Sequence, residues 1–273
     1  MKDLEDPYYN QILYVPTISF NIYDGLLPGM RLHNKTILDK PFLFDINPSY
    51  STRTQSLSGS ASFSLNQYNR DSNLFNIRYT LSGSQFHYAE DAVYTRFNPT
   101  VSMRIRPSIF RDNRIQSIQL RQVLVNREKS ALVTASDENY SIFNARYFNV
   151  KTELTNHLNI NTDLQLASKF GKIAGEIEFR RLFNNNRTIN LRFFAGAFLY
   201  NTTQNDYFSF GLDRPTDYLF DYNYLGRSES TGLVSQQIYI AEGGFKSILN
   251  RRFANQFMTT FNAGFNIWNW IEV

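Results

Sequence analysis

The three histidines, His33, His87 and His157, are the first residues to test for metal chemistry. They are too far apart in the sequence for helical zinc-ligand spacing, and no His-Glu-x-x-His motif occurs. Each fits a polar position at a strand end or in a lumen better than a metal ligand. Phosphate-binding glycine loops and Gly-x-Ser-x-Gly elbows are also absent from the sequence. We therefore expect no catalytic, cofactor-binding or metal-binding residue in this chain.

A second set of residues is charged and alternates with apolar residues. If these side chains line an interior, they either border a solute pathway or form a ladder of cross-strand ion pairs that fills it. We favour the ladder, because opposite charges recur on neighbouring predicted strands. The candidate lumen-facing residues are Arg78, Arg104, Arg106, Arg121, Asp163, Glu176, Glu178, Arg180 and Arg192.

A third set lies in the aromatic and acidic stretch 206–230. Its aspartates invite comparison with calcium loops, but their spacing matches no known loop of that kind. We expect an ordered loop, folded on its own Tyr and Phe side chains, that covers a barrel mouth or holds a partner. The candidate residues of this loop are Asp213, Arg214, Asp217, Tyr218, Asp221 and Arg227.

The strands that must position these residues are clearest between residues 155 and 200. Apolar and polar residues alternate with a period of two through 157–168, 172–180 and 189–200, with Phe170-Gly171 and Asn184-Asn185-Asn186 at the turns. The turn residues tolerate the positive φ angles that hairpins need. The pattern predicts an antiparallel up-and-down meander.

The length of these predicted strands favours a membrane protein. They run about 12 residues, against a mode of about 5–6 in soluble domains and about 9–11 for a strand that crosses a bilayer. One face is apolar throughout, and the other carries Arg, Glu, Asp and Asn. A transmembrane barrel turns its apolar face to lipid and encloses a polar lumen. The fold predicted is an all-β, antiparallel up-and-down transmembrane β-barrel of about 12–14 strands.

Similar alternation predicts strands in the rest of the chain. We expect a first strand near 12–22 that lies at a sheet edge because of Pro16, a turn at 24–29, and a strand at 57–67. After an irregular outer loop at 201–233, strands resume at 236–246 and 256–268. No linker divides the chain, so residues 1–273 are predicted to form one barrel domain.

Composition limits the function classes. The net charge of +4 includes no run of Lys or Arg, which argues against nucleic-acid binding. There is no cysteine, so disulfides and thiol chemistry are excluded. Aromatic residues make up 16%, which suits lipid-facing Phe with interfacial Tyr or, alternatively, a large sandwich core.

Residues 1–6 do not resemble a signal peptide, so we expect the chain to be an internal fragment of an exported protein.

Three stretches resemble a known family. DGLLPGMRLHNKT at 24–36, FSFGLDRPTDYLFDY at 208–222 and LGRSES at 225–230 look like the C-terminal region of membrane-associated gluzincin (M1-like) metallopeptidases of Gram-negative envelope bacteria. The resemblance implies a membrane-embedded module fused to a peptidase whose zinc site lies in an upstream domain. No catalytic residue is carried over to this chain.

The expected function is therefore an outer-membrane β-barrel that anchors an exported metallopeptidase-like domain and does no catalysis itself. Its partners would be the lipid bilayer and the peptidase domain, with no cofactor in this chain and zinc only in an upstream domain. One alternative is a transport or secretion barrel with a working lumen. Another is a soluble β-sandwich binding module.

Overall fold

The computed structural model describes residues 11–36, 40–109, 111–132, 139–221, 240–245, 247, 249–268 and 271–272. Over these residues the chain is all-β, with one 3₁₀ turn and no α-helix, which confirms the predicted class. The strands and the turn are β1 (Leu13–Asn21), β2 (Gly25–His33), β3 (Phe42–Tyr50), β4 (Leu57–Tyr68), β5 (Leu74–Ala89), β6 (Ala92–Ile105), β7 (Ile115–Arg127), β8 (Tyr140–Thr152), β9 (Asn156–Ala167), β10 (Phe170–Leu182), β11 (Thr188–Asn201), η1 (Asp206–Phe208), β12 (Phe210–Gly211), β13 (Phe253–Ala254), β14 (Phe257–Trp268) and β15 (Ile271–Glu272).

No helix long and apolar enough to cross a membrane is found in the described part of the chain.

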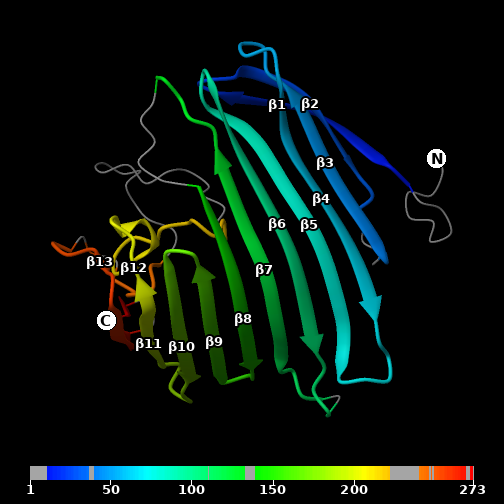
Figure 1. The fold of residues 1–273 in the computed structure, drawn as a ribbon. Helices are drawn as coiled ribbons and strands as arrows, with labels where there is room; N and C mark the ends of the chain where they lie inside the picture. Colours follow the sequence, from blue (N-terminus) through cyan, green and yellow to red (C-terminus); the bar gives the residue numbers. More distant parts are fainter. Residues whose placement is uncertain are drawn as a thin grey trace. The chain divides into compact units, whose positions relative to one another are not determined.

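Twelve long strands, β1–β11 and β14, form an antiparallel up-and-down sheet in chain order (Figure 1). The short β15 pairs with the end of β14, and β12 pairs with β13 in a separate two-stranded sheet. The predicted meander is thereby confirmed. The order begins at β1 and ends at β15, and among the described residues no pairing joins these two strands, so barrel closure stays a prediction.

The chain divides into two compact units, which we describe separately. The first contains Met1–Ile105 and Gln119–Phe143, and the second contains Arg106–Ile118 and Asn144–Val273.

In the first unit, β1–β6 have one apolar and one polar face because their residues alternate. Phe63 on β4 pairs with Leu81 on β5, and Leu81 pairs with Pro99 on β6. Phe63 and Leu81 are 39% and 52% exposed, so this apolar face is not covered within the unit. On the opposite face, Ser64 and Thr80 share a 3.0 Å hydrogen bond.

The turn between β1 and β2 is shorter than predicted. We expected a turn at 24–29, but β2 already begins at Gly25, whose φ of +71° lets the chain reverse there. Asp24 holds this turn from a fully buried position. Its carboxylate accepts hydrogen bonds from Asn21 Nδ2 at 2.9 Å and Thr54 Oγ1 at 3.1 Å, and the Ser51 hydroxyl donates to its carbonyl at 2.8 Å.

In the second unit, the predicted alternation of β9, β10 and β11 is present residue by residue. One apolar row crosses four strands, with Ile160, Ile177, Phe193 and Phe261 paired in turn. Ile177 and Phe193 are each 46% exposed and Phe261 is 64% exposed, so this face too is uncovered within its unit. A register shift at Gly171/Lys172 marks a β-bulge near the end of the β10–β11 pair.

The polar face of the same strands is covered by the stretch that follows β11. This covering segment, which we define as residues 206–221, contains η1 and β12, and β12 pairs with the distant β13. The loop predicted at 201–233 is therefore partly regular, and its residues 222–233 lie outside the described chain. The strand predicted at 236–246 is wrong over residues 240–245, which form turn and coil, whereas the strand predicted at 256–268 is confirmed as β14.

Candidate functional site

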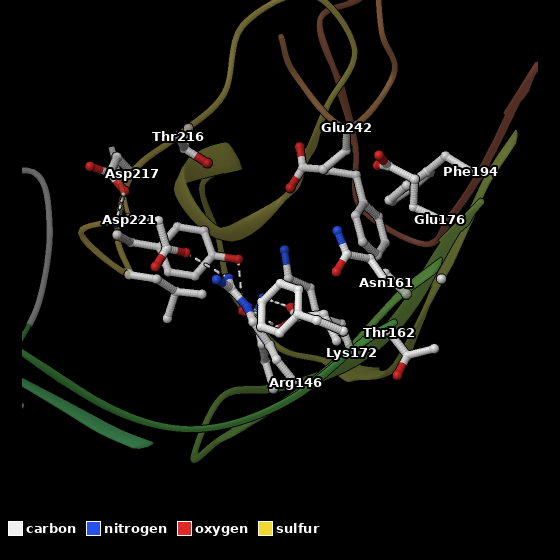
Figure 2. Close-up of a pocket in the computed structure, with 18 residues that line it drawn as sticks. Arg146, Asn161, Thr162, Lys172, Glu176, Phe194, Thr216, Asp217, Asp221 and Glu242 are labelled. Carbon is white, nitrogen blue, oxygen red and sulfur yellow. Dashed lines mark hydrogen bonds and ion pairs between the residues drawn. The ribbon is translucent and has the colours of Figure 1, made fainter. Parts of the chain in front are cut away.

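A cavity of the second unit lies between the polar face of β8–β11 and the covering segment. Its volume is about 240 Å³. Figure 2 shows Arg146 and Lys172 on the side of the sheet, and Thr216, Asp217 and Glu242 on the other side. The lining residues are Arg146, Phe148, Asn161, Thr162, Asp163, Gln165, Lys172, Ala174, Gly175, Glu176, Phe194, Phe210, Thr216, Asp217, Tyr218, Leu219, Asp221 and Glu242.

Lys172 is the most deeply buried charged residue of this site. The alternation of β10 turns its side chain to the polar face, where it is 2% exposed. Its ammonium donates a 3.1 Å hydrogen bond to the carbonyl of Phe208. It also lies 4.6 Å from the ring centroid of Phe210 and 5.1 Å from that of Tyr218. Since aromatic faces attract cations, Lys172 ties the covering segment to β10.

Arg146 on β8 forms a second contact between the sheet and the covering segment. Its guanidinium lies 2.7 Å from Asp163 Oδ1 on β9 and 2.6 Å from Asp221 Oδ2 at the end of the covering segment. Asp163 also accepts hydrogen bonds from Asn144 Nδ2 and from Gln165 Nε2. The carboxylate of Asp163 is therefore satisfied by three donors, as a partly buried charge requires.

Tyr218 makes a third tie through its hydroxyl, which donates a 2.8 Å hydrogen bond to Gln165 Oε1. Burial raises the pKa of the Tyr218 phenol well above its ordinary value, and the nearby carboxylates of Glu242 and Asp163 act in the same direction. The phenol therefore stays protonated and keeps its role as a donor.

Aromatic packing completes the contact. The ring of Phe210 lies 5.8 Å from that of Phe194 and 5.2 Å from that of Phe198, both on β11. Phe208 stacks on Phe170 of β10 at 4.8 Å. Phe194 and Phe210, together with Met258 of β14, form the buried apolar cluster of this site. Because large aromatic side chains bury much apolar surface, this packing adds to the polar ties.

Next to the cavity, a row of polar side chains crosses three strands, with opposite charges on two of them. Arg192 on β11 lies 2.6 Å from Glu176 and 3.7 Å from Glu178, both on β10. Asn159 on β9 donates a 2.9 Å hydrogen bond to Glu178. This is the arrangement of opposite charges on adjacent strands that the ladder hypothesis expects.

The structure brings together some of the predicted site residues and separates others. Asp163, Glu176, Glu178 and Arg192 lie on one polar face, and Asp217, Tyr218 and Asp221 lie over it. Asp213, also in the covering segment, accepts a 2.9 Å hydrogen bond from the Leu249 amide. Arg214 is half-buried, and Arg227 lies outside the described residues.

The remaining arginines of the predicted lumen set lie elsewhere. Arg106 and Arg180 are exposed near the turns at the far end of the second unit. In the first unit, Arg78 donates to Asn66 at 2.6 Å, Arg104 is exposed and Arg121 is buried.

Among the lining residues that were not predicted as site residues, Arg146, Gln165, Lys172 and Glu242 make polar contacts that hold the site together. The alternation through 157–168 and 172–180 places Gln165 and Lys172 on the polar face, but it does not single them out as site residues. Arg146 stands at a polar position of β8, where the same period-two pattern could have placed it. Glu242 accepts a 2.7 Å hydrogen bond from the Gly211 amide, a contact between distant loops that no sequence pattern indicates.

The described residues contain no group of three or more His, Cys, Asp or Glu that could hold a metal ion. Arg146 forms an ion pair with Asp221, and Arg192 forms one with Glu176. Lys172 lies against aromatic rings. The chemistry of the arrangement is therefore that of a clamp, which holds the covering segment on the polar face of the sheet.

No family model, curated protein or solved structure matches this chain.

Proposed function

We propose that this chain is a transmembrane β-barrel module of a Gram-negative outer membrane, which anchors an exported domain and does no catalysis itself. The observation that carries the proposal is the exposed apolar face of the long strands, seen in each of the two units. In the second unit the row through Ile177, Phe193 and Phe261 is uncovered, while the opposite, polar face is covered.

A soluble β-sandwich would have the opposite arrangement. It buries the apolar faces of two sheets against each other and leaves the polar faces in water. Contiguous exposed apolar surface marks a protein or membrane contact. Strands of 12–14 residues, such as β9, β10 and β11, are also long enough to cross a bilayer, which needs about 9–11 residues. Lipid is thus the environment that fits this face.

In a bilayer the sheet must also close. Each unpaired backbone group exposed to lipid costs several kcal/mol, so the outer edges of β1 and of β14–β15 require partners. We propose that these edges are paired in the membrane. β1 stands at one end of the strand order, and its residue Pro16 has no backbone N–H to donate. Pairing along the outer edge of β1 must therefore do without a hydrogen bond from Pro16.

The contacts on the polar face of the sheet favour an anchoring function over an open channel. The covering segment is held there by Lys172, by the Arg146–Asp221 ion pair and by Tyr218. The cross-strand pairing of Arg192 with Glu176 fills further space. A transport barrel with a free lumen, the alternative, would leave this region open.

The identity of the anchored domain rests on the resemblance to membrane-associated gluzincin metallopeptidases. We propose that this domain is peptidase-like and carries its own zinc. The chain of 273 residues should then show no peptidase activity, with or without added zinc.

The test uses neighbouring positions on opposite faces of β10. The chain has no cysteine, so Ile177→Cys and Glu178→Cys each introduce a single label site. After reconstitution into vesicles, a bimane label at position 177 should be quenched by brominated lipid, and one at position 178 should not. Leu191→Cys and Asn190→Cys on β11 repeat the comparison. Equal quenching within both pairs would refute the membrane assignment.

Two further measurements separate the alternatives. A soluble sandwich would stay monodisperse without detergent, whereas the proposed module should aggregate. A transport barrel would conduct ions in a planar bilayer, whereas an anchor with the covering segment in place should conduct poorly.

A further inference from the structure

One end of the second unit carries an unusual concentration of positive charge. At this end β7 begins, β8 ends, β9 begins, β10 ends and β11 begins, so the connections between these strands lie side by side (Figure 1). The Asn113 side chain donates a hydrogen bond to the carbonyl of Thr152, and the Leu182 amide donates one to the carbonyl of Thr155 at 2.7 Å. We call residues 106–109, 111–114, 151–157 and 180–188 the basic rim.

The basic rim contains seven Lys or Arg residues and two acidic residues, Asp112 and Glu153; the cations are Arg106, Arg111, Arg114, Lys151, Arg180, Arg181 and Arg187. At the opposite end of the unit the described charges balance, with Lys169, Lys172, Arg214, Arg251 and Arg252 against Asp206, Asp213, Asp217, Asp221 and Glu242. The positive charge is therefore specific to one end.

Exposed arginines carry most of this charge. All six arginines of the basic rim are exposed. Two cations have local carboxylates, since Arg114 lies 3.9 Å from Asp112 and Lys151 lies 2.6 Å from Glu153. Arg181 and Arg187 form no ion pair with any described residue. An anionic partner would therefore find guanidinium groups that are not already neutralised.

These guanidinium groups lie next to aromatic and apolar side chains. Arg181 lies over the ring of Phe183 at 5.4 Å, and Arg187 lies over Phe265 at 6.0 Å. Leu154, in the turn between β8 and β9, is 98% exposed. Cations beside aromatic rings and exposed apolar residues are typical of surfaces that meet the headgroup region of a bilayer.

We infer that the basic rim binds the phosphate groups of anionic phospholipids in the leaflet that it meets. The inference rests on the proposed membrane function, because strands that cross the bilayer place their ends at headgroup depth. Arginine suits this partner, since its planar fork donates two hydrogen bonds to one phosphate. The rim thus adds a lipid preference to a module that otherwise contacts acyl chains.

The experiment compares neutral and anionic lipid with the whole chain. The protein is reconstituted into phosphatidylcholine vesicles with and without phosphatidylglycerol, and the retained lipids are counted by native mass spectrometry. The unmodified protein should retain phosphatidylglycerol at least tenfold above its share of the membrane, and this enrichment should fall as salt is raised. A triple variant, Arg111→Gln with Arg181→Gln and Arg187→Gln, should lose the enrichment.

The matched control removes three cations from the opposite end, with Lys169→Gln, Arg214→Gln and Arg251→Gln, and should keep the enrichment. Equal retention of the two lipids by the unmodified protein would overturn the inference while leaving membrane insertion intact. So would full enrichment in the rim variant. Failure of the unmodified protein to insert into either vesicle would overturn both this inference and the proposed function. If the rim variant does not fold, the salt dependence of the unmodified protein decides.

Discussion

Gly196 of β11 lies directly against the ring of Phe210 in the covering segment. A Cβ placed on Gly196 would lie 2.7 Å from Cε1 and Cζ of that ring, closer than real Cβ contacts occur. The absence of a side chain at this one position is what lets the aromatic cluster of the covering segment reach the sheet.

The first prediction follows from this contact. Gly196→Ala should destabilise the packing of the covering segment by about 1–3 kcal/mol, because an added methyl group overfills a packed site. Gly175→Ala is the control, since its Cβ would meet one backbone oxygen at 3.9 Å. Protease sensitivity of residues 206–221 in the folded protein measures the effect. Equal sensitivity of the two variants would show that Phe210 moves aside at no cost.

The second prediction concerns the Tyr218 hydroxyl. Tyr218→Phe removes the hydrogen bond to the buried Gln165 and should lower the free energy of unfolding by about 1 kcal/mol. Tyr79→Phe changes an exposed phenol and should shift it by less than about 0.5 kcal/mol. Urea unfolding in detergent gives both values. A larger loss of unfolding free energy for Tyr79→Phe than for Tyr218→Phe would contradict the role assigned to Tyr218 in the clamp.

The third prediction tests lipid exposure energetically. Phe193→Arg, near the middle of β11, should cost about 2–4 kcal/mol in a bilayer, whereas Ile189→Arg, near the start of the same strand, should cost about 0–1 kcal/mol. Both residues stand on the apolar face, so only depth differs. Reversible unfolding from lipid vesicles measures the costs. Equal costs at the two depths would argue against a membrane span.

The fourth prediction is the sidedness of the module. The stretch that follows β11 is longer than the turn between β10 and β11, and long loops of outer-membrane barrels lie outside the cell. A protease site inserted at 203–204 should be cut in intact cells, and one inserted at 184–185 should be spared. The reverse pattern would require the topology to be inverted.

The fifth prediction concerns pH at a turn outside the strands. Asp91 accepts hydrogen bonds from the Ser130 hydroxyl at 2.6 Å and the Ala131 amide at 2.7 Å, and these bonds lower the pKa of its carboxyl. Because the pKa is lowered on folding, the contact stabilises the turn above the ordinary pKa of about 3.9 and is lost as pH falls through the lowered value. The amide chemical shift of Ala131 should follow that titration, and Asp91→Asn should abolish it. A flat shift through this acid range in the unmodified protein would contradict the contact.

The sequence predicts the strands of this fold well because alternation is a local signal. In β9–β11 each residue's face follows from its position, so Asp163 and Glu176 could be assigned to the polar side. The turn at 24–29 was mispredicted because Pro28 and Gly29 read as turn residues. In the structure Pro28 lies within β2, where it pairs with Ile18.

The clamp could be predicted only in part. The aromatic and acidic composition of 206–230 indicated an ordered loop, but not the surface on which it packs. The contacts of Lys172 with Phe208 and Phe210 join residues far apart in sequence, and they depend on the path of an irregular segment. No periodicity encodes such a path, so its partners become visible only in three dimensions.

The pairing of β12 with β13 affects how well the fold tolerates changes in the length of the stretch between these two strands. Phe210 pairs with Ala254 and Gly211 with Phe253, so the two ends of the intervening stretch are fastened beside each other. Lengthening a loop whose ends are already fixed costs little, about 0.6 kcal/mol for each doubling. Related proteins should therefore differ in length within the part of this stretch that makes none of the clamp contacts, and foreign peptides grafted there should leave the β12–β13 pair and the ion pair of Asp221 in place.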